Sequence, residues 1–171
     1  MRQFSHVEAH IPLSAKAVPP DVLENLTSRT VEDAVVAEFA EPPVVENEAL
    51  SEWMTLINSK LDAILHILTL QREGFSSLPM RHVLISGGGI SFITRTEYQP
   101  GDTLEIKLVL PSVSPLALYI YGKVESVEKL ESGNRVGVEF ISMDETVRDK
   151  IVDFVFRRER DILREKHEEG Y

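Results

Sequence analysis

The sequence contains no cysteine, and its start carries no long apolar run. Without cysteine the chain has no disulfide framework, thiolate nucleophile or cysteine metal ligand, which fits a reducing compartment. Without an apolar stretch of the required length, the start of the chain opens neither a signal peptide nor a membrane span. We therefore expect a cytoplasmic protein that does not insert into membranes.

Positive charge is also scarce. The 171 residues include 28 acidic and 18 basic side chains, which gives a formal net charge of −10. Nucleic acids and anionic membranes are bound by clustered cations, so this balance argues against either as a partner. The apolar content of 43% is that of a soluble globular chain with one core and some appendages.

Groups that could form a catalytic site are few. His6 and His10 could share one face of a strand, but no third metal ligand stands at a diagnostic spacing. Ser86 has no base near it in the sequence that would make it a nucleophile. The sequence therefore predicts neither an enzyme nor a bound metal or cofactor.

The most informative segment is residues 86–92, Ser-Gly-Gly-Gly-Ile-Ser-Phe, which lies between two apolar stretches. Glycine accepts positive φ and lets another chain segment or a ligand approach the backbone closely. A bulge or a tight connection between two strands is one interpretation. A phosphate loop or a dinucleotide fingerprint is excluded, because neither Gly-Lys-Ser/Thr nor a helix follows the glycines.

Alternating apolar residues then predict several strands and a closing helix. Residues 103–110, 116–127 and 135–141 are predicted strands, with turns at 98–102 and 131–134. The helix is expected over 144–168, with Asp144 as its N-cap. We expect it to bury one face, made of Val147, Ile151, Phe154, Val155, Ile162 and Leu163.

This order of elements, with Ser-x-x-Gly-Ile first and Val-Gly-Val-Glu-Phe last, resembles the PilZ domain over roughly residues 78–164. The resemblance implies an α+β fold, in which residues 78–143 form a six-stranded antiparallel PilZ-like β-barrel and the helix at 144–168 packs on it. It also implies a setting in bacterial cyclic di-GMP signalling, with motility, surface behaviour or virulence as outputs.

The resemblance is incomplete at the nucleotide site. Many PilZ domains bind cyclic di-GMP through an Arg-x-x-x-Arg pair before the barrel and an Asp/Asn-x-Ser-x-x-Gly motif on the first strands. Ser86 and Gly89 match the second motif, but Leu84 stands where Asp or Asn is expected. The nearest upstream arginines, Arg72 and Arg81, are nine residues apart, so the bidentate pair is missing.

Two interpretations of this site remain open. In the first, the positions of Arg81, Leu84, Ser86 and Gly89 form a degenerate site, and the protein binds no dinucleotide. In the second, the protein is a weak cyclic di-GMP receptor, in which Arg81, Ser86 and Gly89 act together with arginines of the last helix. The second interpretation requires Arg157 or Arg160 to lie close to Ser86.

Residues 49–73 predict a helix with a heptad seam, which Gly74 ends. Leu65 and Ile67 flank the seam at positions e and g, and leucine at a with isoleucine at d favours four parallel helices. The alternative is an amphipathic helix that packs on its own barrel. The seam residues recur at spacings of four and three, and are Leu50, Met54, Ile57, Leu61, Ile64 and Leu68.

The stretch at 56–62, Leu-Ile-Asn-Ser-Lys-Leu-Asp, followed by Ile64 and Leu65 and then a PilZ barrel, is similar to a subset of bacterial PilZ-like proteins with an added helix. Some members of that subset assemble as tetramers through a parallel heptad-repeat bundle and lack the nucleotide-binding motifs. The resemblance implies a homo-oligomer, with a tetramer favoured, that acts by binding signalling proteins not yet identified.

Residues 1–48 are predicted to be a strand followed by an acidic connecting segment. Val7, Ala9, Ile11 and Leu13 alternate with more polar residues, as in a half-buried strand. We expect this strand to add at an edge of the barrel or of the coil.

Overall fold

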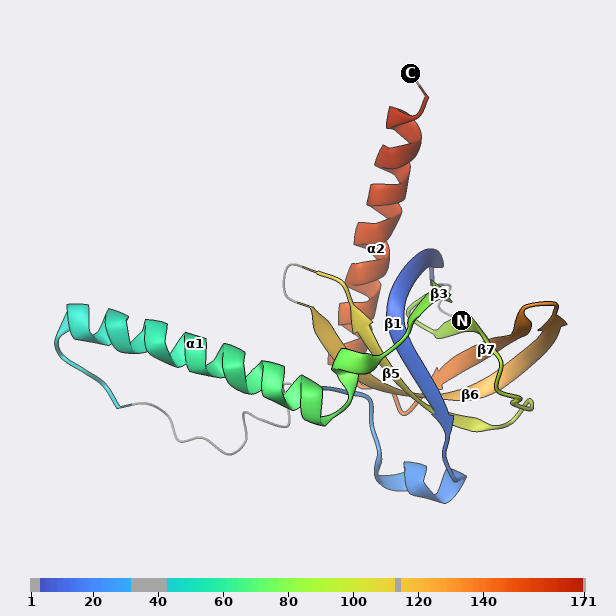
Figure 1. Cartoon of the computed structure of the whole chain (residues 1–171), viewed down its shortest axis with the longest axis horizontal. Helices are drawn as coiled ribbons and strands as arrows, with labels where there is room; N and C mark the ends of the chain where they lie inside the picture. Colours follow the sequence, from blue (N-terminus) through green and yellow to red (C-terminus); the bar gives the residue numbers. More distant parts are fainter. Residues whose placement is uncertain (1–3, 32–42, 113–114, 171) are drawn as a thin grey trace.

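The structure is a computed structural model that describes residues 4–31, 43–112 and 115–170. Within these ranges the chain forms a β-barrel, one helix packed against it and a second helix that points away from it (Figure 1). Part of the predicted acidic connecting segment, residues 32–42, lies outside the described residues.

The barrel is closed, because each of its strands pairs with two neighbours. The pairing order is β1, β3, β4, β7, β6 and β5, and β5 pairs with β1 again. All of these pairs are antiparallel, so the predicted six-stranded antiparallel barrel is confirmed. The strands are β1 (Val7–Ala17), β3 (Met80–Ile85), β4 (Gly89–Thr94), β5 (Thr103–Leu110), β6 (Leu116–Leu130) and β7 (Gly133–Ile141).

The first strand closes the ring. The first half of β1 pairs with β3, and its second half, from Leu13, pairs with β5. The prediction that this strand adds at an edge is therefore wrong, because β1 has hydrogen-bonded neighbours on both sides. Along the sequence, β1 precedes the heptad helix and the other five barrel strands follow it. The two-residue strand β2 (Arg29–Thr30) pairs with β6 outside the ring.

The barrel core follows the alternation of the strands. In β5, Leu104, Ile106, Leu108 and Leu110 point inward and are buried, while the residues between them are partly exposed. Since successive side chains of a strand point to opposite faces, this pattern fixes the inner face.

The helix α2 (Glu145–Glu168) packs against the barrel with its first half. The Asp144 carboxylate accepts hydrogen bonds from the backbone N–H groups of Thr146 and Val147, as expected for an N-cap. The buried residues are Val147, Ile151, Phe154 and Val155, and Ile162 is partly buried. The prediction that Leu163 is buried is wrong, because α2 runs past the barrel and this residue is exposed (Figure 1).

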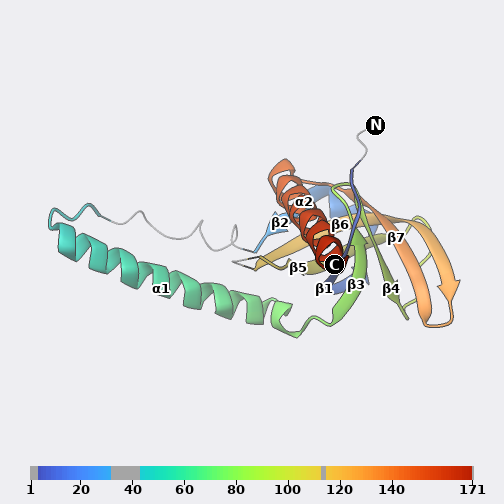
Figure 2. The same ribbon diagram turned by 90° about the horizontal axis from the view of Figure 1, so that it is seen from above.

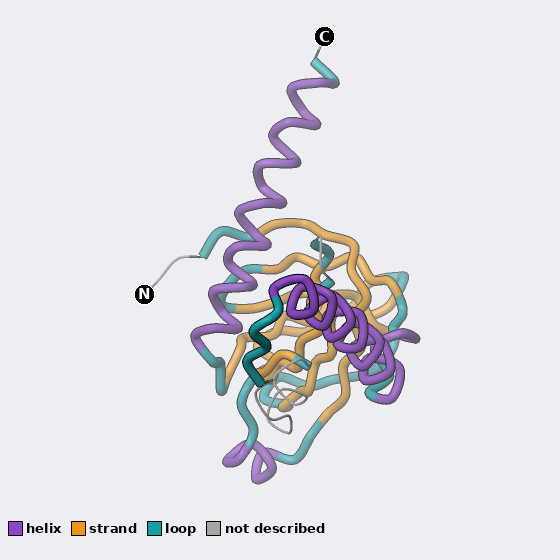
Figure 3. The backbone as a smooth tube through the Cα atoms, turned by 90° about the vertical axis from the view of Figure 1, so that its left-hand side faces the viewer, coloured by secondary structure: helices purple, strands orange, loops and turns teal. Residues whose placement is uncertain are grey.

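The helix α1 (Glu48–Arg72) follows a short 3-10 helix, η1 (Pro20–Asn25), and β2, and it precedes a second 3-10 helix, η4 (Phe75–Ser77). Viewed from above, α1 extends from the barrel on one side, at a distance from α2 (Figure 2). Figure 3 looks towards the tip of α1, with the barrel strands behind it. None of the helices in the described ranges has the length and apolar character needed to cross a membrane.

Candidate functional site

The helix α1 has well-defined ends. The Asn47 side chain accepts a hydrogen bond from the Leu50 backbone N–H at 3.0 Å, which caps the first turn. At the other end Gly74 has φ 81°, the left-handed conformation that glycine tolerates best, and the chain leaves the helix there. Its length therefore follows from local sequence signals.

The predicted seam of α1 is exposed, and none of the described residues buries it. No residue of this helix is buried, and the six seam residues are 40% to 54% exposed. Leu65 and Ile67 beside the seam are exposed as well. The described part of the barrel therefore does not cover the stripe, and the alternative of a helix packed on its own barrel does not hold for these residues.

Two large apolar residues of α1 were not among the predicted ones. Trp53 is 61% exposed and Leu56 is 49% exposed. In the same heptad register they occupy positions g and c, next to the seam on one side. Their spacing of three is the signal that could have identified them, because residues three or four apart share a helix face.

The glycine turn at residues 86–89 is a compact hairpin connection between β3 and β4. Ser86 is 2% exposed, and its hydroxyl oxygen accepts hydrogen bonds from the N–H groups of Gly88 and Gly89, each at 3.2 Å. The Ser86 N–H donates to the Gly89 carbonyl at 2.9 Å. The serine is thus occupied by the turn itself.

Of the two properties for which glycine could be needed here, positive φ does not apply, because none of these three glycines has it. They are required for close packing instead. A Cβ at Gly89 would lie 2.5 Å from the carbonyl oxygen of Val138, and a Cβ at Gly87 would lie 2.6 Å from the ring of Phe4. The turn is therefore covered by neighbouring protein atoms.

The structure keeps Gly89 beside Ser86 but separates Arg81 from it. Arg81 lies at the opposite end of β3, roughly 16 Å away for five residues of extended chain. Its guanidinium donates to the backbone carbonyls of Leu13, at 3.3 Å, and Ile93, at 2.9 Å. Arg81 thus ties β1 to β4, where β1 turns from β3 to β5. Leu84 lies on the outer face of β3 and offers no polar atom.

A weak receptor requires Arg157 or Arg160 close to Ser86. Both arginines line a surface hollow on α2 together with Phe156 and Leu163, and Ser86 is not among the residues that line it. Arg148 lies with its guanidinium 5.8 Å from the centre of the Phe4 ring. The same ring packs on Gly87 and Gly88 of the turn.

Closure of the barrel by β1 also changes where a paired-arginine motif belongs. Such a motif belongs before β1, and not in the stretch between Arg72 and Arg81. Arg2, which lies outside the described residues, is followed four positions later by His6, so these two residues do not form an Arg-x-x-x-Arg pair.

The sequence profile of the PilZ domain matches residues 68–157, more than half of the chain. The chain belongs to the PilZ family. No curated protein is similar enough to this PilZ chain to match it. The expected family and fold are confirmed, while the nucleotide motif departs from the family pattern at Leu84.

Solved structures that resemble this PilZ chain include the following three. A tetrameric PilZ domain protein from Xanthomonas campestris, self-assembled through a helical bundle, has a TM-score of 0.62 at 18% identity over 95% of this chain and 92% of that one. The inhibitor of motility MotI/DgrA from Bacillus subtilis has a TM-score of 0.54 at 10% identity over 94% of this chain and 52% of that one. YcgR from Escherichia coli, in complex with c-di-GMP, has a TM-score of 0.45 at 20% identity over 56% of this chain and 41% of that one.

Proposed function

We propose that this PilZ protein is a non-enzymatic module that assembles as a tetramer through α1 and acts by binding other proteins in cyclic di-GMP-related signalling. The observation that carries the proposal is the uncovered seam of α1. Burial of each large apolar side chain stabilises by roughly 1.5–3 kcal/mol, so six of them on one stripe favour association strongly. Other copies of the same helix offer a matching stripe.

The identities along the seam support four helices over two. Leucine at positions a and isoleucine at positions d are the pattern that favours tetramers, and Leu61 and Ile64 follow it. The flanking positions hold mostly uncharged residues, including Leu65 and Ile67, and lack the ionic pairs that select dimers. The tetrameric helical bundle of the Xanthomonas campestris protein is consistent with this assembly.

Light scattering on the purified protein tests the assembly. The wild-type protein should give close to four times the chain mass of 19.3 kDa. The double variant Leu61→Asp/Ile64→Asp should be a folded monomer, because it places charges in the seam. The matched control, Thr55→Asp/Ser59→Asp, adds the same charges on the outer face of α1 and should stay tetrameric. A wild-type monomer at micromolar concentration would contradict the proposal.

We also propose that cyclic di-GMP does not bind at physiological levels. The Ser86 hydroxyl is held by the turn, Arg81 is held by backbone carbonyls, and Leu84 is apolar. Each missing charged hydrogen bond removes roughly 1.5–3 kcal/mol. Titration calorimetry should show no heat of binding. A low-micromolar dissociation constant for the wild-type protein would contradict this proposal and favour the weak receptor instead.

The same variants serve to find protein partners. A pull-down from native lysate with the wild-type protein and with Leu61→Asp/Ile64→Asp separates two kinds of partner. Partners that need the assembled particle should be lost in the variant, while partners of a single barrel should be retained. Recovery of the same set at the same level by both would show that assembly plays no part in partner binding.

A further inference from the structure

The base of α1 is attached to the barrel by an aromatic cluster on the outer face of β6. The rings of Phe75 and Tyr119 meet edge to face, with centroids 5.2 Å apart. The guanidinium of Arg29, from β2, lies 4.2 Å from the centre of the Tyr119 ring, on which it stacks as a cation. Val31 and Ala117 complete this small core, against which Leu70 of α1 packs.

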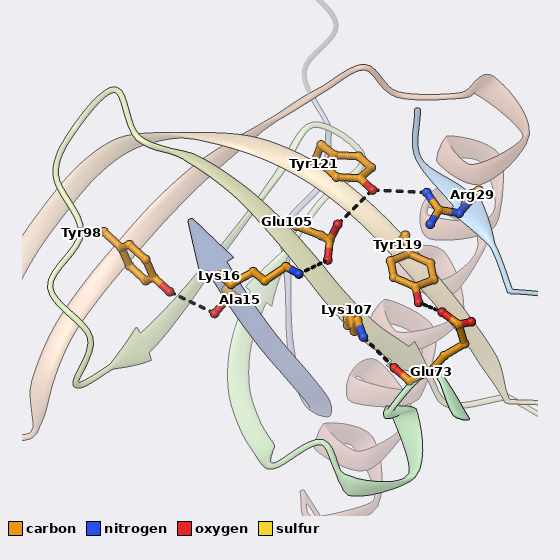
Figure 4. Close-up of polar contacts among 9 residues, drawn as sticks. All are labelled: Ala15, Lys16, Arg29, Glu73, Tyr98, Glu105, Lys107, Tyr119 and Tyr121. Atoms are coloured by element: carbon orange, nitrogen blue, oxygen red, sulfur yellow. Dashed lines mark hydrogen bonds and ion pairs between the residues drawn. The ribbon is translucent and has the colours of Figure 1, made fainter. Parts of the chain in front are cut away.

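Glu73, the residue that ends α1, is bound at two points (Figure 4). Its carboxylate accepts a hydrogen bond from the Tyr119 hydroxyl of β6. Its backbone carbonyl accepts one from the Lys107 ammonium of β5, at 2.6 Å. Two directional hydrogen bonds to two different strands fix the angle between α1 and the barrel. Apolar contact alone does not fix this angle, because it is not directional.

A second set of polar contacts supports the first. Arg29 donates to the Tyr121 hydroxyl at 3.2 Å, and that hydroxyl donates to Glu105 at 3.2 Å. Glu105 also pairs with Lys16 of β1 at 3.3 Å. The chain of contacts therefore runs from β2 over β6 and β5 to β1 (Figure 4). It holds Arg29 in place over the Tyr119 ring.

We infer that Glu73 and Tyr119 are positioning residues that fix the direction of α1 relative to the barrel. The helix acts as a lever, because 25 residues extend over about 37 Å. A rotation of about 10° at its base would move its tip by about 6 Å for that length. In the tetramer of the proposed function, on which this step rests, the same angle sets the spacing and orientation of the barrels.

A distance measurement within one chain tests the inference. Because the chain has no cysteine, spin labels can be placed at Glu52→Cys near the tip of α1 and at Lys129→Cys on the barrel. Dilution with unlabelled protein leaves only the distance within a chain. The unmodified pair should give one narrow distance distribution. Glu73→Ala and Tyr119→Phe should broaden it, and Tyr119→Phe keeps the ring that packs on Phe75.

The matched control is Glu73→Gln, which keeps an oxygen that accepts from Tyr119 and should retain the narrow distribution. Equal widths in all variants would overturn the inference. Light scattering on the same samples shows separately whether the tetramer exists. A failure of the proposed assembly can therefore be distinguished from a failure of the inference about Glu73 and Tyr119. The thermal midpoint of the barrel should stay near the wild-type value in Tyr119→Phe, which shows that broadening does not come from unfolding.

Discussion

The barrel and α1 contain comparable apolar patterns with opposite outcomes. Along β5 every second side chain is buried, with Leu104, Ile106 and Leu108 fully inaccessible, whereas the 25 residues of α1 include no buried one. A strand with period two finds its partners within the same ring, because β1 and β6 flank β5. The heptad stripe of α1 finds none in the described chain. A regular apolar pattern is thus buried within the barrel in one region, whereas in α1 it is exposed in the described chain, and the proposed partner is another copy of the helix.

The largest expected effect separates the two regions directly. Leu108→Ala should destabilise the barrel by about 2–5 kcal/mol, through lost burial and the cavity left behind. Urea unfolding followed by tyrosine circular dichroism should show this loss at every protein concentration. The control Leu61→Ala removes the same atoms from α1 and should leave the barrel transition unchanged. Equal losses in both variants would mean that α1 contributes to the barrel core.

A smaller effect is expected at the glycine turn. Gly89→Ala should cost about 1–3 kcal/mol, because the new methyl group meets the Val138 backbone carbonyl, which cannot move without disturbing β7. The adjacent Gly88→Ala is the control, since its new methyl group meets only the Phe4 side chain, 3.0 Å away. Thermal midpoints should rank Gly89→Ala clearly below Gly88→Ala. The reverse order would show that the close contact with β7 is not what requires glycine.

Alkaline pH should lower the free energy of unfolding of the barrel by a smaller amount than these substitutions. Burial raises the pKa of Tyr98, Tyr119 and Tyr121 above the ordinary 10.0, so these hydroxyls keep their protons when the unfolded chain has lost them. Their contribution to stability is therefore present below pH 10.0 and is lost as pH rises above it. Urea midpoints measured across this range should fall. Tyr119→Phe should make the fall shallower, and an identical pH profile in this variant would contradict the assignment to Tyr119.

The smallest expected change is spectroscopic. Trp53 is the only tryptophan of the chain and lies on α1, so its fluorescence reports on that helix alone. Dilution below the assembly range should shift its emission to longer wavelength, because mass action exposes the ring to water. The tyrosine signal of the barrel should not change over the same dilution. A Trp53 emission that is independent of concentration would contradict the expectation that α1, unlike the barrel, loses apolar contacts on dilution.

Local patterns predicted much of this molecule. The alternation in residues 103–110, the cap at Asp144 and the stop at Gly74 each depend on neighbours within one turn or strand, and each is confirmed. The place of β1 was not predictable in this way, because alternation identifies a strand but not the strands with which it pairs. The glycines at 87–89 were expected to allow positive φ or a close approach of another segment, and the sequence did not decide between the two, since glycine serves both.

The contacts at the base of α1 lie furthest beyond the reach of the sequence. Glu73 and Tyr119 are 46 positions apart, and no period or motif links them. Leu163 shows a related limit, because the apolar face of α2 continues past the point where the barrel ends. The seam of α1 is the opposite case. Its heptad spacing is readable from the sequence, while its partner remains a proposal.

The position of β1 has a consequence for the order in which the protein folds. This strand is synthesised before the other barrel strands, yet both of its barrel partners, β3 and β5, are synthesised only after α1. Closing so long a loop is entropically costly and slows folding. During synthesis β1 therefore lacks both of its partner strands at the time when all residues of α1 have been synthesised. Until residue 110, the end of β5, has emerged, β1 can pair with wrong strands. Binding of a chaperone to the nascent chain would have its largest effect during this period.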